Sequence, residues 1–599
     1  MTKTWQYAPF DEARIQRLSR ELRVSNLLAQ VLLARGFDDA EPATAFLNAK
    51  LSDLHDPDTL SHVPEAAERI IAAIKAGRRI TIYGDYDVDG VTSTSLLWQL
   101  ITLADGKVDY YIPHRLEEGY GLNAEAIRQL AEEDADRLVV TVDCGICSVE
   151  EAALAKSLGI ELIITDHHEF GAQLPDAAAI VHPRLPGAHA PFTDLCGVGV
   201  AFKLAWGISQ RLGDGKKAPG PLRDFLVQAV GLAAIGTVAD VVPLLGENRV
   251  IVRYGLNALG SKSSIGLKAL MTVAGIKLNQ ELQSDDIGFA IAPRINAAGR
   301  LGQARLAVEL LTSTNAERTE ALASYLDQLN QSRRTVERKI FKHCKEMIEE
   351  RPEWLESRAL VLAHADWHAG VIGIVANRVA EQFSKPAILI SLSRQDRIGQ
   401  GSGRSFAGLN LIESLTVCAG HLVTFGGHQA AVGLKISSER IEEFREQFCR
   451  AIGVQHERGI EEVVHKVDAE VRLADLSKHA VQELDRLGPF GKENERPTFV
   501  ATRVQLAEPP RTMGEGDRHL SLTLKQHGCT LRAVAFGKGD WAEPLSQLTG
   551  TISIRFAPSI NRFRGYETVQ LQLMDWQADE FSEISSNTIR NDDVNAIEM

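Results

Sequence analysis

Three clusters of acidic and histidine residues each follow a short, apolar, β-branched run, and such side chains bind divalent metal ions. The clusters are Asp85, Asp87 and Asp89 after residues 79–83 (RITIY), Asp143 after residues 138–142 (LVVTV), and His167 with His168 after residues 161–165 (ELIIT). Oxygen ligands alone suit Mg²⁺, and imidazole shifts the preference towards Mn²⁺ or another transition ion. The residue types therefore predict a metal centre.

These clusters are expected to meet, because the carboxyl ends of parallel strands lie on one edge of a sheet. Asp240, where the apolar residues 236–239 end, is a plausible fourth contributor. Carboxylates crowded together resist ionising, and divalent cations remove that penalty. Two such ions can clamp a phosphate, lower the pKa of a bridging water and stabilise the leaving oxygen. The pattern thus indicates phosphoester hydrolysis.

Each cluster alone has an ordinary explanation. The three aspartates could form a turn or a calcium loop, although Gly90 directly after Asp89 breaks the EF-hand spacing. The histidine pair could equally be structural. All the clusters together argue against a purely structural role. Cys144 and Cys147 form a C-x-x-C motif without a thioredoxin context or a second pair, so we interpret both as packing residues.

The elements that must position these clusters form several domains, since 599 residues exceed what one hydrophobic core supports. Helices alternating with short strands predict a parallel sheet covered by helices. Residues 315–351 contain no Gly or Pro and predict one long helix. A second, smaller α/β pattern follows, and the strand-rich region after it predicts an OB-type β-barrel. The barrel strands are expected at residues 498–506, 520–524, 531–536, 551–556 and 568–573.

The expected segments are an N-terminal helical segment (1–50), a catalytic domain (51–314), a connecting helix (315–352), a substrate-binding domain (353–456), an OB-type domain (457–577) and an acidic tail (578–599).

The sequence resembles the DHH phosphoesterase superfamily, named for residues 166–168, and within it the exonucleases of single-stranded DNA. The resemblance extends from about residue 27 to residue 576. It is carried by residues 83–93 (YGDYDVDGVTS), 112–122 (IPHRLEEGYGL), 143–145 (DCG), 236–243 (GTVADVVP) and 293–302 (PRINAAGRLG). Residues 401–405 (GSGRS) and 426–433 (GGHQAAVG) resemble the DHHA1 substrate-binding module.

This resemblance implies two divalent ions, Mn²⁺ or Mg²⁺, and degradation of single-stranded DNA from its 5′ end in repair and recombination. The implied metal ligands are Asp87, Asp89, Asp143, His167 and Asp240, with Asp85 a weaker candidate. Asp143 would bridge the ions, and His168 would face the scissile phosphate. The implied partners are single-stranded DNA, a single-strand-binding protein and a helicase.

Several residues could hold the strand. Residues 401–403 would bring the backbone close to a phosphate, although an ordinary flexible turn has the same composition. The candidate substrate-binding side chains are Arg115, Arg294, Arg300, Ser402, Arg404, Ser405, His428, Arg562, Phe563 and Arg564. Arg562, Phe563 and Arg564 interleave basic and aromatic groups, as a single-strand binder requires, but a β-hairpin turn is an equal alternative. The basic residues around Arg333 are either a solvated helix face or a DNA contact.

Bulk properties are compatible with this hypothesis. The net charge of −14 does not exclude a polyanionic substrate, because local patches decide phosphate binding. Seven cysteines are no disulfide scaffold and, with no signal pattern or bilayer-length apolar run apparent, indicate a cytoplasmic protein. Two other functions remain open: a hydrolase of small phosphates that shares the metal site, and a non-catalytic DHH scaffold.

Overall fold

The structure, a computed structural model, describes residues 4–115, 117–277, 280–393, 397–459, 464–563 and 566–579, with only the backbone at Phe563. The chain forms two compact units. One comprises residues 50–462 together with 489–493. The other comprises residues 1–49, 463–488 and 494–599. Each unit is described separately.

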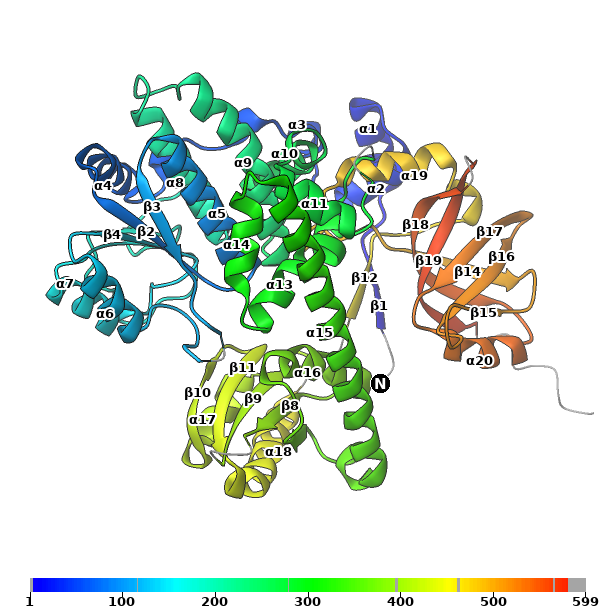
Figure 1. Ribbon diagram of the computed structural model, residues 1–599. Helices are drawn as coiled ribbons and strands as arrows, with labels where there is room; N and C mark the ends of the chain where they lie inside the picture. Colours follow the sequence, from blue (N-terminus) through cyan, green and yellow to red (C-terminus); the bar gives the residue numbers. More distant parts are fainter. Residues whose placement is uncertain are drawn as a thin grey trace, which may run out of the picture. The chain divides into compact units, whose positions relative to one another are not determined.

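The first sheet of the larger unit is wholly parallel, in the order β3-β2-β4-β5-β6. Its strands are β2 (Arg79–Gly84), β3 (Lys107–Tyr111), β4 (Leu138–Val142), β5 (Glu161–Thr165) and β6 (Ala179–Val181). Helices α4 (Val63–Ala76), α5 (Val88–Leu103) and α8 (Gly197–Arg211) pack on one face, and α6 (Ala124–Glu133) and α7 (Val149–Ser157) on the other (Figure 1). The predicted helix-covered parallel sheet is confirmed.

A helical layer extends this domain. It contains α9 (Gly220–Ala239), α10 (Gly246–Lys262), α11 (Ile265–Val273), the short α12 (Ser284–Asp286), the π-helix η3 (Ile287–Ile291), α13 (Ala292–Arg300) and α14 (Ala304–Thr312). No apolar run was expected to be long enough to cross a bilayer, yet among the described residues α9 alone has the length and hydropathy of a membrane span. The protein buries 61% of its apolar window, as it would in a core helix.

The predicted long helix is α15 (Ala316–Glu350), with 35 residues and a length of about 50 Å at 1.5 Å per residue. The side chain of Asn315 caps its first turn by accepting a hydrogen bond from the backbone N–H of Arg318. The helix packs on α11, α13 and α14, and also on α16 (Ala369–Phe383) of the next domain. It therefore joins the two α/β domains directly.

The second sheet is mixed, in the order β10-β11-β9-β8-β7, and only β7 and β8 are parallel. Its strands are β7 (Leu360–His364), β8 (Ala387–Leu392), β9 (Ile398–Arg404), β10 (Leu422–Gly427) and β11 (Ala431–Ser437). Helix α16 packs on β8 and β9, and α18 (Ile441–Glu457) shares an apolar core with the sheet.

Residues 401–403 do not form the flexible turn that was the alternative to a phosphate contact. They lie in β9, which pairs with β8 on one side and β11 on the other. A Cβ atom at Gly401 would lie 2.6 Å from Leu434, and one at Gly403 would lie 2.6 Å from Val432. The glycines are therefore needed for packing, and the alternation of a strand turns Ser402 and Arg404 to the opposite face.

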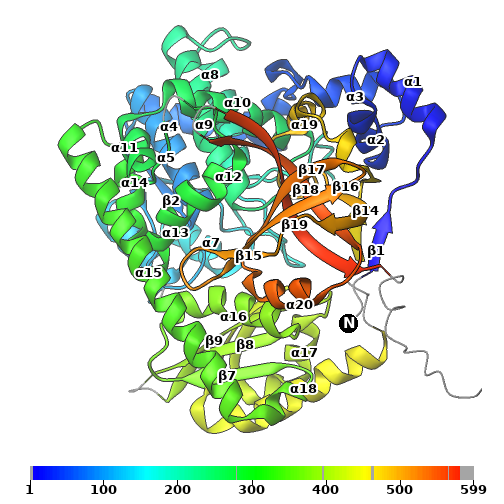
Figure 2. The ribbon, with the colours of Figure 1, turned by 90° about the vertical axis from the view of Figure 1, so that its right-hand side faces the viewer.

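The smaller unit contains the predicted barrel (Figure 2). Strands β14, β18, β19, β17 and β16 are neighbours in that order, and a β14–β16 pairing closes the ring. They span β14 (Phe499–Leu506), β16 (His519–Gln526), β17 (Cys529–Ala535), β18 (Ile552–Phe563) and β19 (Tyr566–Ala578). The OB-type barrel is confirmed.

The N-terminal residues belong to the barrel's unit. Strand β1 (Thr4–Tyr7) pairs in parallel with β12 (Val464–Val467). Helices α1 (Glu12–Leu22), α2 (Asn26–Ala34) and α3 (Ala40–Leu47) follow. Gln30 Nε2 donates to the Asp468 carbonyl over 3.0 Å. The acidic tail from residue 580 onward lies outside the described residues.

Candidate metal centre and phosphate site

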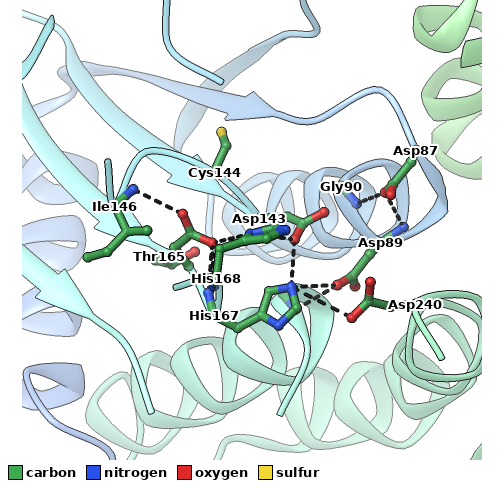
Figure 3. A network of polar contacts seen from close by, with 12 residues as sticks. Asp87, Asp89, Gly90, Asp143, Cys144, Ile146, Thr165, His167, His168 and Asp240 are labelled. Atoms are coloured by element: carbon green, nitrogen blue, oxygen red, sulfur yellow. Dashed lines mark hydrogen bonds and ion pairs between the residues drawn. The ribbon is translucent and has the colours of Figure 1, made fainter. Parts of the chain in front are cut away.

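Carboxylates from three segments surround one imidazole nitrogen (Figure 3). His167 Nε2 lies 3.2 Å from Asp143 Oδ1, 3.6 Å from Asp240 Oδ2 and 3.9 Å from Asp89 Oδ2. Asp85, Asp87 and Asp143 form an adjoining group, each with a carboxylate oxygen within 4.8 Å of the others. The structure thus brings together all six residues expected to bind metal.

The start of helix α5 positions the first cluster. Asp87 is its N-cap, and Oδ1 accepts hydrogen bonds from the backbone N–H groups of Asp89 and Gly90. Asp89 is fully buried, and its two oxygens accept from the N–H groups of Gly197 and Val198 at 2.6 and 2.7 Å. The positive end of α8 therefore orients Asp89.

Asp143 occupies a strained position directly after β4. Its φ of 61° lies in the left-handed region, which few residues other than glycine adopt. A Cβ atom at Gly197 would lie 2.6 Å from the Asp143 Cβ. Gly197 therefore provides the space in which the Asp143 carboxylate reaches the other ligands. Such strain is typical of functional sites.

Asp240, expected as a ligand where an apolar run ends, does not follow a strand. It follows helix α9 as its C-cap. The residues before Asp240 are almost all apolar, so their pattern does not distinguish the period of a helix from the alternation of a strand. The next residue, Val241, has a φ of 58°, which is unfavourable for a β-branched side chain.

The carboxyl groups are poorly able to ionise together. Burial and the charge of Asp87 raise the pKa of Asp89 to about 7, and burial with the charges of Asp89 and Asp87 raises the pKa of Asp240 to about 8. Lys492 partly opposes the latter shift. Burial and neighbouring aspartates raise the pKa values of Asp85 and Asp143 well above normal.

The donor set fits divalent cations. Burial, together with the charge of His168, lowers the pKa of His167 to about 3, so its imidazole is neutral and available as a ligand. Asp85 Oδ1, Asp143 Oδ1 and His167 Nε2 are buried and have no hydrogen-bond partner among the described residues. Buried acceptors facing one another without donors are costly, and a cation would satisfy them.

Asp166 was named as part of the DHH motif but given no role, and the structure supplies one. Its Oδ1 accepts from the backbone N–H of His167 and contacts His168 Nδ1 at 2.7 Å, and its Oδ2 accepts from the N–H of Ile146. Burial opposes charge on His168, but the Asp166 hydrogen bond and nearby carboxylates raise its pKa to about 9. His168 is therefore cationic at neutral pH.

Tyr120 completes the surroundings of His168. Its hydroxyl donates to the Asp143 carbonyl over 3.1 Å and lies 3.0 Å from His168 Nδ1. It belongs to residues 112–122, and the sequence signal was its place in that motif.

An arginine cluster lies beside the metal centre. Burial and the charges of Arg115, Arg333 and Arg404 lower the pKa of Arg300 to about 10. The positive charge of Arg115 acts to lower the pKa of Asp85. The negative charge of Asp87 acts to raise the pKa of Arg300. Cations gathered in this way favour an anionic ligand.

The cluster joins the two α/β domains. Arg300 Nη1 donates to the Gly370 carbonyl over 3.3 Å, and Arg404 Nη1 contacts Ser402 Oγ at 3.2 Å. Arg115 stacks on the ring of Tyr86, with its Cζ atom 4.7 Å from the centroid. Arg115, Arg300, Ser402 and Arg404, all expected from the sequence, therefore contribute to one region.

The other residues expected to bind substrate lie outside this cluster, and most of them contact other parts of the protein. Arg294 pairs with Asp327 of α15 at 2.8 Å, and Ser405 Oγ donates to the Leu409 carbonyl. His428 is exposed after β10. Arg562 pairs with Glu567 across the β18–β19 hairpin at 3.0 Å. The side chain of Phe563 and the whole of Arg564 lie outside the described residues.

All seven cysteines are free thiols. Cys144 is buried, as expected, whereas Cys147 is exposed and is not a packing residue. Cys196, which the sequence analysis did not single out, lies beside Asp89 and Asp240. Burial and those two carboxylates raise the pKa of its thiol well above normal, so it stays protonated.

Comparison with known proteins now adds to this geometry. Residues 79–237 match the model of the DHH family N-terminal domain, residues 356–453 the DHHA1 domain and residues 467–575 the RecJ OB domain. The single-stranded-DNA-specific exonuclease RecJ of Bacillus subtilis (strain 168) is 39% identical over 96% of this chain and 71% of its own. The chain belongs to the RecJ family.

Other RecJ proteins agree. The RecJ of Escherichia coli (strain K12) is 34% identical over 91% of this chain and 94% of its own. The crystal structure of RecJ from Thermus thermophilus in complex with Mn²⁺ has a TM-score of 0.81 and 29% identity, covering 96% of this chain and 80% of that one. The corresponding Mg²⁺ complex has a TM-score of 0.73 and 28% identity, covering 96% and 79%. The resemblance seen in the motifs is confirmed.

Proposed function

We propose that this protein is a metal-dependent exonuclease that degrades single-stranded DNA from the 5′ end. The observation that carries the proposal is the juxtaposition of unpartnered carboxylate and imidazole atoms with an arginine cluster in one unit. Hydrolysis of a phosphodiester in a DNA strand uses both features. The arginine cations hold the strand while the metal centre acts on one bond. Membership of the RecJ family supports the same reaction.

The residues that would hold two ions, Mn²⁺ or Mg²⁺, are Asp85, Asp87, Asp89, Asp143, His167 and Asp240. When bound, the ions supply Lewis-acid stabilisation of the phosphate and a lower pKa for an attacking water. Asp143 belongs to two of the potential ligand groups, which suits it to bridge the ions.

His168 acts on the phosphate as a cation. Its side chain is 42% exposed, so a substrate can reach it, and the hydrogen bond to Asp166 fixes the ring. A protonated imidazole stabilises negative charge that builds up on the phosphate oxygens. Asp166 positions His168 and keeps it charged.

Arg115, Arg300 and Arg404, with Ser402, hold a strand phosphate next to the metal centre. An arginine fork matches phosphate geometry through two parallel hydrogen bonds. A terminal 5′-phosphate held there places the first phosphodiester towards the metal ligands. The 5′ polarity rests on the family resemblance.

Each of the three main segments has its own task in this reaction. Residues 51–314 carry the metal ligands and residues 353–456 carry Ser402 and Arg404. Residues 457–577 supply an OB-type barrel for sequence-independent binding by base stacking. The relatives process DNA, which is consistent with a soluble protein. We place it in the cytoplasm, in DNA repair and recombination, with a single-strand-binding protein and a helicase as partners.

The test uses purified full-length protein and strands labelled at either end. Single strands should be shortened from the 5′ end in Mn²⁺, with a stall at a blunt duplex and no reaction in a chelator. Preferential cleavage of a dinucleotide would instead indicate a small-phosphate hydrolase. No cleavage of any substrate would indicate a scaffold.

A further inference from the structure

Five residues near the start of the barrel region belong to the catalytic unit. Residues 489–493 group with residues 50–462, although Gly488 before them and Asn494 after them belong to the other unit. The segment is anchored at two points. Leu244 N–H donates to the Lys492 carbonyl over 2.9 Å, and Ser284 Oγ donates to the Phe490 carbonyl. Phe490 is buried, with 6% of its surface exposed.

The first anchor is the end of the turn that carries Asp240. From Asp240 the chain passes through Val241, whose left-handed φ of 58° is unfavourable for a β-branched residue, and reaches the buried Leu244 within four residues. Such a conformation persists only where the surroundings fix it. Asn248 Nδ2 holds the Pro243 carbonyl at 3.0 Å, and Lys492 holds Leu244.

Glycine is needed at the point of closest approach. A Cβ atom at Gly491 would lie 2.6 Å from Leu244 Cδ1 and 3.0 Å from its Cγ. Only a residue without a side chain leaves Leu244 in place there. Gly491 and Lys492 therefore contact Leu244 through both packing and a backbone hydrogen bond.

We propose that residues 489–493 are a positioning element of the metal centre, because Gly491 and Lys492 fix Leu244 and thereby the turn that places Asp240 beside Asp89 and His167. The segment contributes no metal ligand. It supports the turn that carries one ligand, and changes to residues that orient metal ligands commonly lower metal affinity or activity about 10–100-fold. Its part in cleavage rests on the proposed function, whereas its part in metal binding does not.

The test is made on the full chain with Gly491→Val, which pushes Leu244 away, and Ser284→Ala, which releases the second anchor. Gly260→Ala in α10 is the control, since a Cβ there meets nothing within 4 Å. Mn²⁺ binding is measured directly, from the electron paramagnetic resonance signal of free Mn²⁺. We expect one Mn²⁺ to bind about 10-fold or more weakly in the first two variants and unchanged in the control.

Cleavage kinetics give the second readout. At limiting Mn²⁺ the kcat of Gly491→Val should fall, and saturating Mn²⁺ should restore most of it, with an unchanged KM for a single strand. General destabilisation would not be reversed by metal in this way. Wild-type Mn²⁺ affinity in a folded Gly491→Val would overturn the proposal, and if that variant does not fold, unchanged affinity in Ser284→Ala would do so. Failure of the proposed function would appear as inactive wild-type protein.

Discussion

Asp143 Oδ1 lies 3.2 Å from His167 Nε2, and neither atom has a hydrogen-bond partner among the described residues. Because the pKa of His167 is lowered to about 3, its imidazole is neutral and this contact is not an ion pair. A cation between the two buried ligand atoms would satisfy both of them at once. The arrangement therefore favours binding of ions and destabilises the metal-free site.

Removing the Asp143 carboxylate should abolish cleavage. We expect Asp143→Ala and Asp143→Asn each to lower kcat more than about 100-fold, beyond the usual effect of outer-shell residues. Asn is the cleaner change, because it tolerates the left-handed φ of 61°. Binding of single strands should persist. Near-normal turnover in either variant would contradict the bridging assignment.

Metal identity gives a second prediction. Mn²⁺ should support cleavage at least as well as Mg²⁺, because His167 adds an imidazole to the oxygen ligands. Ca²⁺ should bind without supporting cleavage, since it is larger and lowers the pKa of bound water less. Mn²⁺ at 100 times the Kd should stabilise the folded protein by about 2.7 kcal/mol for each site and so raise its melting temperature. Full activity in Ca²⁺ would contradict the mechanism.

The sequence predicted the catalytic sheet well. Strands β4 and β5 were expected at their observed bounds, because strands buried on both faces form uninterrupted β-branched runs. Because the strand ends share one edge, the convergence of Asp143 with the other ligands could be inferred before any geometry was known.

Other features could not be predicted from local composition. Strand β9 is rich in glycine, which strands usually disfavour, because Leu434 and Val432 lie where side chains would project. Arg294 resembled a phosphate ligand because its partner, Asp327, lies on another helix. The role of residues 489–493 depends on a contact with Leu244, far away in the sequence.

Arg404 should be specific for a terminal phosphate. Arg404→Lys removes the two-pronged contact, and we expect about a 10-fold or greater loss on 5′-phosphorylated strands, in line with the free energy of charged hydrogen bonds. Strands without that phosphate should be affected much less. Arg397→Lys is the control, since Arg397 is an exposed partner of Glu439. Equal loss on both substrates would assign Arg404 another role.

Asp166 should matter although it is no expected metal ligand. Asp166→Asn removes the charge that holds His168 protonated and weakens the Nδ1 contact of 2.7 Å. We expect kcat to fall about 10–100-fold, the usual range for an outer-shell partner. Mn²⁺ affinity, measured by calorimetry, should change less than in Asp143→Asn. A kcat equal to that of the wild type would show that the charge on His168 is unimportant.

The barrel should determine binding to long strands. Removing everything from residue 461 onward is an unsuitable test, because residues 1–49 would lose the rest of their unit and residues 489–493 would be lost from the catalytic unit. Point changes avoid both effects. We expect Arg562→Ala combined with Phe563→Ala to weaken binding of a long strand by about 5- to 150-fold, equivalent to the loss of one stacked base at about 1–3 kcal/mol.

The comparison between substrates decides this prediction. The same double variant should cleave a saturating short strand at nearly the wild-type rate, because the metal ligands and Arg404 are untouched. Binding of long strands, followed by fluorescence anisotropy, should also weaken as salt rises, since phosphate contacts release counterions. Thr568→Ala on β19 is a control in the same hairpin. If the double variant bound long strands as tightly as the wild type, the hairpin would not belong to the binding surface. Arg562 would then serve only to pair with Glu567.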